Sequence, residues 1–297
     1  MQLLVFIGDF PVEQPQTVVE KKNPLAAYYR QPKIYVKLPS GGRFYAPGSL
    51  DVSVSGEYPV FSMTAKDEIM FKTPDALLSG QSTVEVIKSC IPAIIDPWQM
   101  PTIDVDFCLI AIRIATFGDS MEVGSVCPHC QEENSFDMNL TGWLDQYHGY
   151  DYQDVVTVGD LEVYLRPFSY REMSNTSIKT LEQQRIFSIV NDDTMSDEEK
   201  MAKFSESFTK LTDLTVDIVA TCISKIVTPS GETSDVSFIK EFINNCPSDV
   251  FDTISKHLSA QKEKIDIKAQ EVACGECSEP YLLPVTMDQS NFFAVRS

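Results

Sequence analysis

The chain has 297 residues and a net charge of −19, which arises from 24 basic and 43 acidic residues. This length allows one large domain or two ordinary ones, and no apolar run approaches the roughly 20 residues of a membrane-spanning helix. Binding to nucleic acid is disfavoured, because neutralisation of phosphates by Lys and Arg dominates that affinity. We therefore expect no membrane and no nucleic acid among its partners, and the acidic surface favours a protein partner with a basic face.

Residues 1–32 are predicted to form an extended N-terminal arm. The segment contains Pro11, Pro15, Pro24 and Pro32, and it is too polar and too interrupted to form a core of its own. We expect this arm to become ordered only on a partner or on the rest of the chain.

Residues 33–167 are predicted to form an α+β body. Strands are expected at Ile34–Leu38 and in short pieces from Val52 to Met63, and Pro39 ends the first of them. Helix N-caps and a proline at the first helical position mark where the following helices begin. Three short helices are expected, beginning after Thr64, at Thr73–Gly80, and over residues 83–91.

Thr102–Phe117 is predicted to be a buried helix, because apolar residues cover most of its circumference. Arg113 is the one cation in this segment, and Asp106 lies two turns earlier on the same edge. We favour a structural role for Arg113, in which it ties the helix to a carboxylate or to backbone carbonyls, over a catalytic one. Gly118 ends the helix.

Two pairs of cysteines with the spacing Cys-x-x-Cys follow the buried helix. Each pair has the geometry of half a zinc site, and two pairs supply the four thiolates of a closed tetrahedral site. Apolar and polar residues alternate around both pairs, which indicates strands and hence two hairpins. The sequence therefore predicts a zinc ribbon with a structural Zn²⁺ as cofactor, whose ligands are Cys127, Cys130, Cys274 and Cys277.

Other roles of these cysteines stay open. The run Cys127-Pro128-His129-Cys130 also occurs in oxidising thiol enzymes, but these need the first thiol at a helix N-terminus, and a strand pattern follows Cys130. Disulfides are a further alternative, although Met1–Asp9 lacks the basic residues of a secretory signal and a reducing compartment favours metal. His129 is expected to be an exposed residue of the turn rather than a ligand.

Charge around the cysteines is negative throughout. Between Arg113 and Arg166 the sequence has ten carboxylates and no Lys or Arg, and basic residues are absent again from Ala269 to Val295. A ribbon of this charge would repel a phosphate backbone.

Residues 168–264 are predicted to be a helical insertion between the two cysteine pairs, preceded by a hairpin around Gly159. Ser169–Glu172 and Ser196–Glu199 match the capping box. Met201, Phe204 and Phe208 recur at helical spacing and are expected in the core. Helices are expected at about 170–190, 197–226, 235–245 and 248–262, and residues 265–297 then carry the second cysteine pair and a C-terminal strand.

Several blocks of the sequence resemble a baseplate hub or hub-assembly protein family of T-even-like contractile-tailed bacteriophages. Their order along residues 36–297 carries the resemblance. The blocks are Leu38–Tyr45, Met63–Glu68, Thr73–Gly80, Ile87–Pro92, Asp96–Trp98, Leu109–Gly118, Cys127–Cys130 and Asp288–Phe293. The resemblance implies a place in the virion baseplate or in the host cytoplasm during assembly, with other baseplate and hub proteins as partners.

Together these features predict a non-enzymatic α+β protein with a zinc ribbon interrupted by an inserted helical domain. No catalytic residue is identified, because the sequence contains no Gly-rich phosphate loop, no Ser-His-Asp spacing and no zinc-hydrolase motif, and no small-molecule substrate is expected. The predicted function is a structural component or assembly factor of the baseplate hub. The alternatives are a zinc-ribbon adaptor in transcription or replication and, less favoured, a thiol oxidoreductase.

Overall fold

The computed structural model describes residues 23–72, 80–189, 196–283 and 292–293. Contacts divide the chain into two units, Met1–Gln31 and Pro32–Ser297. In the first unit, η1 (Pro24–Tyr28) is a 3-10 helix without buried residues, and its N-cap Asn23 accepts a hydrogen bond from the Leu25 N–H. The rest of the predicted arm, residues 1–22, lies outside the described residues, so its extended form stays a prediction.

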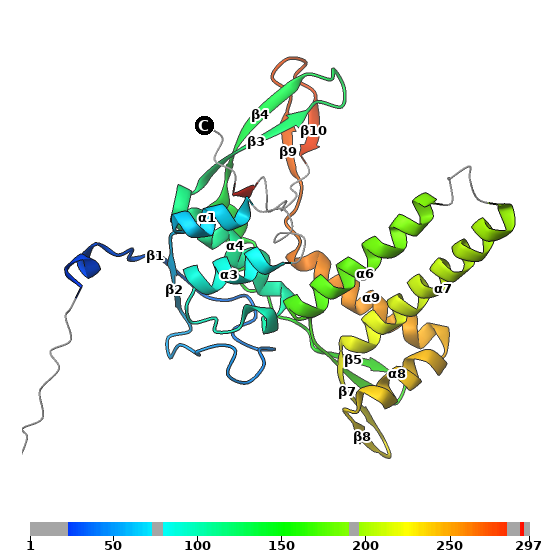
Figure 1. Cartoon of the computed structure of the whole chain (residues 1–297). Helices are drawn as coiled ribbons and strands as arrows, with labels where there is room; N and C mark the ends of the chain where they lie inside the picture. The colour runs from blue at the N-terminus through cyan, green and yellow to red at the C-terminus, as the bar shows by residue number, and fades with distance from the viewer. Residues whose placement is uncertain (1–22, 73–79, 190–195, 284–291, 294–297) are drawn as a thin grey trace, which may run out of the picture. The chain divides into compact units, whose positions relative to one another are not determined.

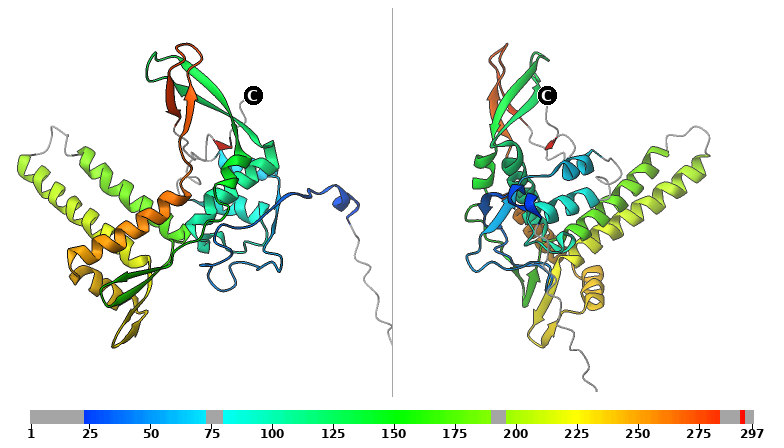
Figure 2. Two further views of the ribbon diagram at one scale, coloured as in Figure 1. Left: turned by 180° about the vertical axis from the view of Figure 1, so that it is seen from behind. Right: turned by 60° about the vertical axis from the view of Figure 1, so that its left-hand side comes forward.

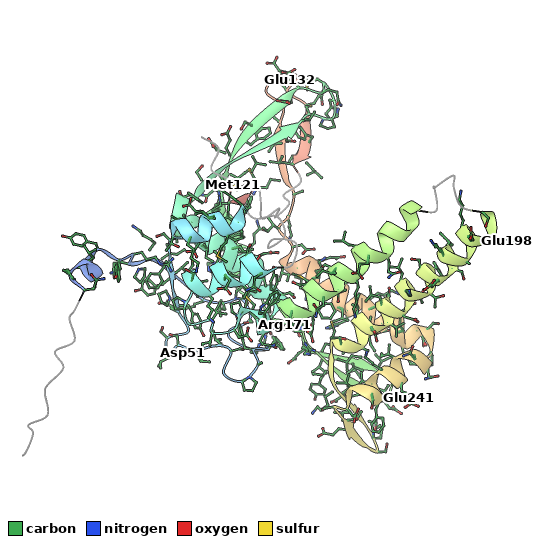
Figure 3. The ribbon with its side chains drawn as sticks, in the orientation of Figure 1. Asp51, Met121, Glu132, Arg171, Glu198 and Glu241 are labelled. Carbon is green, nitrogen blue, oxygen red and sulfur yellow. The ribbon has the colours of Figure 1, made fainter. Side chains whose placement is uncertain are left out.

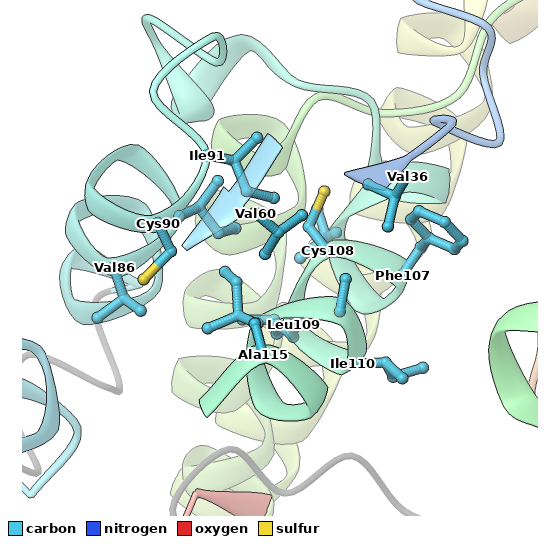
Figure 4. Close-up of a cluster of buried hydrophobic side chains, with 14 of the residues drawn as sticks. Val36, Val60, Val86, Cys90, Ile91, Phe107, Cys108, Leu109, Ile110 and Ala115 are labelled. Carbon is cyan, nitrogen blue, oxygen red and sulfur yellow. The ribbon is translucent and has the colours of Figure 1, made fainter. Parts of the chain in front are cut away.

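The larger core of the second unit is built around the helix α4 (Thr102–Phe117), which has the predicted bounds. Its central residues, from Cys108 to Ile112, are fully buried. Figure 4 shows this part of the core, where side chains of α4 lie beside Val60 and Cys90. The elements that contact α4 include β1 (Pro32–Val36), β2 (Tyr58–Phe61), α3 (Gln81–Cys90), α5 (Leu140–Asp145) and α6 (Tyr170–Ile189).

The other short elements of this part of the chain follow the sequence in most places. Thr64 caps α1 (Ala65–Phe71) in a capping box with Asp67, as the N-cap signal predicts. The β1–β2 pair is antiparallel, whereas Val52 and Val54 are exposed and lie in no strand. The 3-10 helix η2 (Pro97–Gln99) precedes α4. The helix expected at Thr73–Gly80 falls on residues 73–79, outside the described residues.

A second core surrounds a four-stranded antiparallel sheet (Figure 1). Its strand order is β5-β6-β7-β8, and the predicted hairpin forms the first two strands. Val163, Ile226, Ile239 and Ile254 are among its buried residues. The elements are β5 (Val155–Val158), β6 (Leu161–Leu165), β7 (Ile223–Thr228), β8 (Gly231–Thr233), α8 (Val236–Asn245) and α9 (Ser248–Ile265).

The predicted helix 197–226 is wrong at its end. The helix α7 (Asp197–Thr221) stops at Thr221, and Ile223 and Ile226 belong to β7, which pairs with β6 on one side and β8 on the other. β-Branched residues fit a pleated surface, and pairing on both edges outweighs the helical spacing of these isoleucines. The sheet takes strands from both sides of residue 168. The boundary proposed there between the body and the helical insertion stays a prediction.

The stripe of Met201, Phe204 and Phe208 on α7 is not part of a core, contrary to expectation. These side chains are 77%, 46% and 61% exposed. The described contact between α7 and α6 instead involves Ser207, one residue before Phe208, whose hydroxyl donates to Gln183 Oε1 at 3.0 Å. A step of one residue turns a helix by about 100°, so Phe208 lies to the side of this contact.

Arg113 is the predicted structural tie of α4, and it binds a carbonyl rather than Asp106. Its guanidinium donates from Nη1 to the carbonyl oxygen of Phe292. Its Cζ atom lies 5.3 Å from the ring centres of Phe117 and of Phe292. The buried helix thereby holds a segment 179 residues further along the chain.

Asp104 is the second polar anchor of α4 and has no basic partner among its hydrogen bonds. The Ser40 N–H and hydroxyl donate to it at 2.8 and 2.6 Å, and the Tyr45 hydroxyl donates at 3.0 Å. Complete burial raises the pKa of Asp104 to about 6, although these three donors act in the opposite direction. The carboxyl group fixes the loop after β1 to the core helix.

The predicted α+β class is confirmed. The chain combines helices with small antiparallel sheets. Within the described ranges, no helix is both long and apolar enough to cross a membrane.

Acidification from pH 7 to pH 5 should relieve a destabilising effect of Asp104. Its folded pKa of about 6 lies above its ordinary value of 3.8, so the folded state binds the additional proton between these values. The destabilisation is therefore full above pH 6 and is lost as the pH falls. We expect this effect to raise the free energy of unfolding by about 1 kcal/mol between pH 7 and pH 5.

Denaturant titrations at both pH values measure this contribution. The variant Asp104→Asn, which carries no charge at this position, should lack it, while Asp51→Asn at an exposed position should behave like the wild type. A difference between wild type and Asp104→Asn that is the same at both pH values would contradict the raised pKa.

Candidate functional site: a four-cysteine metal centre

Two β-hairpins carry the cysteine pairs at their tips, as the sequence predicts. In the first, β3 (Ser120–Val126) pairs with β4 (Glu133–Asn139). In the second, β9 (Gln270–Ala273) pairs with β10 (Pro280–Leu283). The hairpins lie side by side in the views of Figures 1 and 2. Figure 3 labels Met121 in β3 and Glu132 at the tip of the first hairpin.

The turn of the first hairpin is closed by two backbone hydrogen bonds. The Cys127 N–H donates to the Glu132 carbonyl, and the Gln131 N–H donates to the Cys127 carbonyl, both at 2.9 Å. Gln131 has a φ of 62°, in the left-handed region. This conformation lets the chain return directly after the second cysteine.

The turn of the second hairpin has the same two backbone hydrogen bonds. The Cys274 N–H donates to the Glu279 carbonyl at 3.1 Å, and the Ser278 N–H donates to the Cys274 carbonyl at 3.0 Å. Ser278, at the position equivalent to Gln131, has a φ of 59°. Two unrelated stretches of sequence thus form the same turn, with the left-handed residue directly after the second cysteine.

The four cysteine sulfurs gather at one point between the turns. Their Sγ atoms all lie within 4.8 Å of one another, with 3.8 Å from Cys127 to Cys277 and 3.6 Å from Cys130 to Cys274. A disulfide requires about 2.05 Å between sulfurs, whereas a tetrahedral metal with bonds of about 2.3 Å separates its sulfurs by roughly 3.8 Å. The spacing fits a tetrahedral metal centre, and all four cysteines are free thiols.

The thiols of this site differ strongly in acidity. Backbone N–H groups of Cys277 and Glu276, together with the Asn134 amide, lower the pKa of Cys274 to about 6. The Glu132 N–H favours the Cys130 thiolate, but desolvation and the neighbouring sulfurs outweigh it and raise the pKa of Cys130 to about 12. Four thiolates this close together therefore need a cation to compensate their mutual repulsion.

The buried half of the site packs on the faces of the two hairpins. Cys127 and Cys274 are buried together with Tyr281, and Phe136 and Val272 contact this small cluster. Cys130 is exposed and Cys277 is half-buried. This division leaves one side of the site open to solvent and anchors the other in the ribbon.

Asn134 joins the two turns and was not identified from the sequence. Its Nδ2 atom donates to Cys274 Sγ at 3.5 Å and to the Glu132 carbonyl at 3.0 Å, while its Oδ1 atom accepts from the Gly275 N–H at 2.8 Å. One amide on β4 therefore holds the opposite turn in place. An Asn inside a strand gives no local signal of this role, which depends on a contact across 140 residues.

His129 and the remaining cysteines lie outside the site. His129 is exposed and does not belong to the sulfur cluster. Cys90 and Cys108 are buried in the larger core. Since β4 follows the first cysteine pair, the helix N-terminus that activates the thiol of oxidoreductases is not found after Cys130.

Replacing Asn134 with Ala should weaken metal binding without unfolding the hairpin. Groups that orient metal ligands typically change the affinity on the order of 10- to 100-fold, and Asn134→Ala removes all three bonds of the amide. Competition with a chromogenic chelator for Co²⁺ or Zn²⁺ measures the effect. Ser135→Ala, at the exposed next position of the strand, is the matched control, and equal affinities in both variants would rule out the bridging role.

Comparison with known proteins gives one family. The family model described as T4 bacteriophage base plate protein matches residues 31–294, which confirms the resemblance to a phage baseplate family. No curated protein and no solved structure matches the chain. The match includes both cores, both cysteine pairs and the residues between the two cysteine pairs. The chain therefore belongs to the family of T4 bacteriophage base plate proteins.

Proposed function

We propose that the chain is a structural component or assembly factor of the baseplate hub, in which a structural Zn²⁺ holds the two hairpins together. The family match supports a role of the chain as a structural protein of the phage baseplate, in the virion tail. The assignment to the hub rests on the order of the sequence blocks between residues 36 and 297. Interaction with other baseplate proteins follows from membership of the family.

The ligands of the proposed Zn²⁺ are Cys127, Cys130, Cys274 and Cys277. The spacing of their sulfurs supports this assignment, and a site of four thiolates is typical of structural zinc. Among the residues that the structure describes, these cysteines are the one group of His, Cys, Asp and Glu side chains able to hold a metal ion. Four protein ligands complete the shell, so the geometry supports an architectural role rather than catalysis.

The surface of the ribbon argues for a protein partner. Glu132, Glu133, Glu276 and Glu279 are all exposed beside the cysteine turns. Neither hairpin contains a Lys or Arg, so the ribbon lacks the cations that drive binding to nucleic acid. A basic surface on another baseplate protein would complement it, whereas the adaptor and oxidoreductase alternatives gain no support from this geometry.

Purified protein should carry one Zn²⁺ per chain. Structural sites of this kind contribute on the order of 10 kcal/mol to stability, because ligands and fold assemble together. Cys127→Ser should therefore lose the metal and unfold the ribbon. Cys246→Ser, at a half-buried cysteine outside the site, should retain the metal. Elemental analysis and thermal unfolding measure both effects, and zinc-free wild type after reduction would refute the assignment.

Disruption of the gene should abolish normal contractile tails in the phage that encodes it. A hub component or an assembly factor is needed before the tail can form, so electron microscopy should show a loss of assembled tails and plating a loss of infectivity. Supply of the wild-type gene in trans should restore both. Normal infectious tails without the protein would exclude the proposed role.

A DNA-binding measurement on the purified protein tests the adaptor alternative. Tight DNA binding with a steep salt dependence would favour that alternative.

A further inference from the structure

The two helices α6 and α7 form a hairpin, residues 170–221, whose described contributions to the cores come from its base. Tyr170 and Met173 belong to the larger core, and Val216, Val219 and Ala220 to the second. None of the described residues between 174 and 215 belongs to either core. Figures 1 and 2 show the two helices running side by side beyond these base residues.

The contact between the two helices beyond the base includes a partly buried polar pair. Ser207 is 1% exposed, and its hydroxyl donates to Gln183 Oε1. Two helices normally pack by turning their apolar stripes toward each other. Leu211 and Leu214, on the same face of α7 as Ser207, are half-buried, whereas Met201 and Phe208 lie off that face and are exposed.

Other faces of the hairpin carry large apolar side chains. On α7, Met201 and Phe208 are 77% and 61% exposed and lie seven residues apart, which places them on one face of the helix. On α6, Ile178 and Leu181 are 39% and 51% exposed. Single exposed apolar residues are ordinary, but a row along a helix that faces away from both cores is typical of a binding surface.

The neighbours of Met201 and Phe208 one helical turn away are negative or neutral, although Lys200 directly precedes Met201. Segment 170–221 contains ten acidic and six basic residues. Among the basic residues, Lys210 is paired with Glu206 at 2.7 Å. Figure 3 labels Glu198 near the start of α7. Among the residues whose side chains the structure describes, the neighbours three and four positions from Met201 or Phe208 are Glu198, Phe204, Ser205, Leu211 and Thr212, none of them basic.

We propose that the Met201–Phe208 face of α7 docks an amphipathic helix of a different protein, whose apolar stripe is flanked by Lys or Arg. The apolar stripe would cover Met201 and Phe208, and the basic flanks would complement the acidic side chains near them. A second copy of this chain is the less suitable occupant, because it would bring the same acidic flanks and a net charge of −19. The inference deepens the assembly role proposed above by assigning a surface and the chemistry of its partner.

Synthetic helical peptides test the chemistry of this surface directly. One peptide has Leu at the positions i, i+3, i+4 and i+7 with Lys at the remaining ones, a second has the same composition in scrambled order, and a third has Glu in place of Lys. Fluorescence anisotropy with the full-length, metal-loaded protein measures their binding. We expect the Leu/Lys peptide to bind and the other two peptides not to bind. Its affinity should fall at least tenfold in 0.5 M salt.

Variants then locate the binding to the hairpin. The double variant Met201→Ser/Phe208→Ser should weaken the Leu/Lys peptide at least tenfold. Val54→Ser, which removes a fully exposed apolar side chain elsewhere on the chain, should bind like the wild type. All three proteins should unfold at the same temperature, because the replaced side chains are exposed. Equal binding by the double variant, or no binding by any protein, would overturn the proposal.

Sedimentation velocity distinguishes the competing occupant. The wild type should stay monomeric over the concentration range of the binding experiment, whereas self-association that the double variant abolishes would assign the face to a second copy and refute the proposal. These measurements use purified protein and peptides alone. Their outcome is therefore separate from the tail-assembly experiment, which can fail while the docking face is confirmed, or the reverse.

Discussion

The helix α4 imposes the main physical constraint on this protein, because it has almost no polar face and must be covered on all sides. β1, β2, α3 and α5 supply that cover from the sequence on both sides of the helix. Two of its polar side chains act as anchors. Asp104 fixes the loop that contains Ser40, and Arg113 holds the backbone at Phe292. Burial thus turns two polar residues into ties between distant segments.

The ribbon depends on the same helix, since β3 starts two residues after Gly118, the C-cap of α4. Met138 of the first hairpin and Leu283 of the second belong to the core around α4, so the bases of both hairpins are fixed there. Near the tips the apolar contact shrinks to a cluster around Tyr281. A two-stranded hairpin is marginal in water. Between the tips the Asn134 amide makes hydrogen bonds with Cys274 and Gly275, and a cation bound to the four thiolates would add a stronger link.

Local signals in the sequence predict those features whose causes are local. The capping boxes at Thr64, Ser169 and Ser196, the bounds of α4 and both cysteine turns follow from a few neighbouring residues each. Features that arise from distant contacts were missed. Pairing with β6 and β8 makes a strand of 223–228, and Asn134 reaches Cys274 across 140 residues. The stripe on α7 was assigned to a core because periodicity identifies a face without identifying what covers it.

The identical turns at the two cysteine pairs have a topological consequence. A metal bound to both turns closes the 143 residues between Cys130 and Cys274 into a ring, so the sheet and the α6–α7 hairpin become a loop with a single covalent entry and exit, both at the metal. A peptide bond cut anywhere in this ring would leave two fragments that the metal still joins. A bound ion would therefore keep the two ends of this ring together even where the backbone between them is cut.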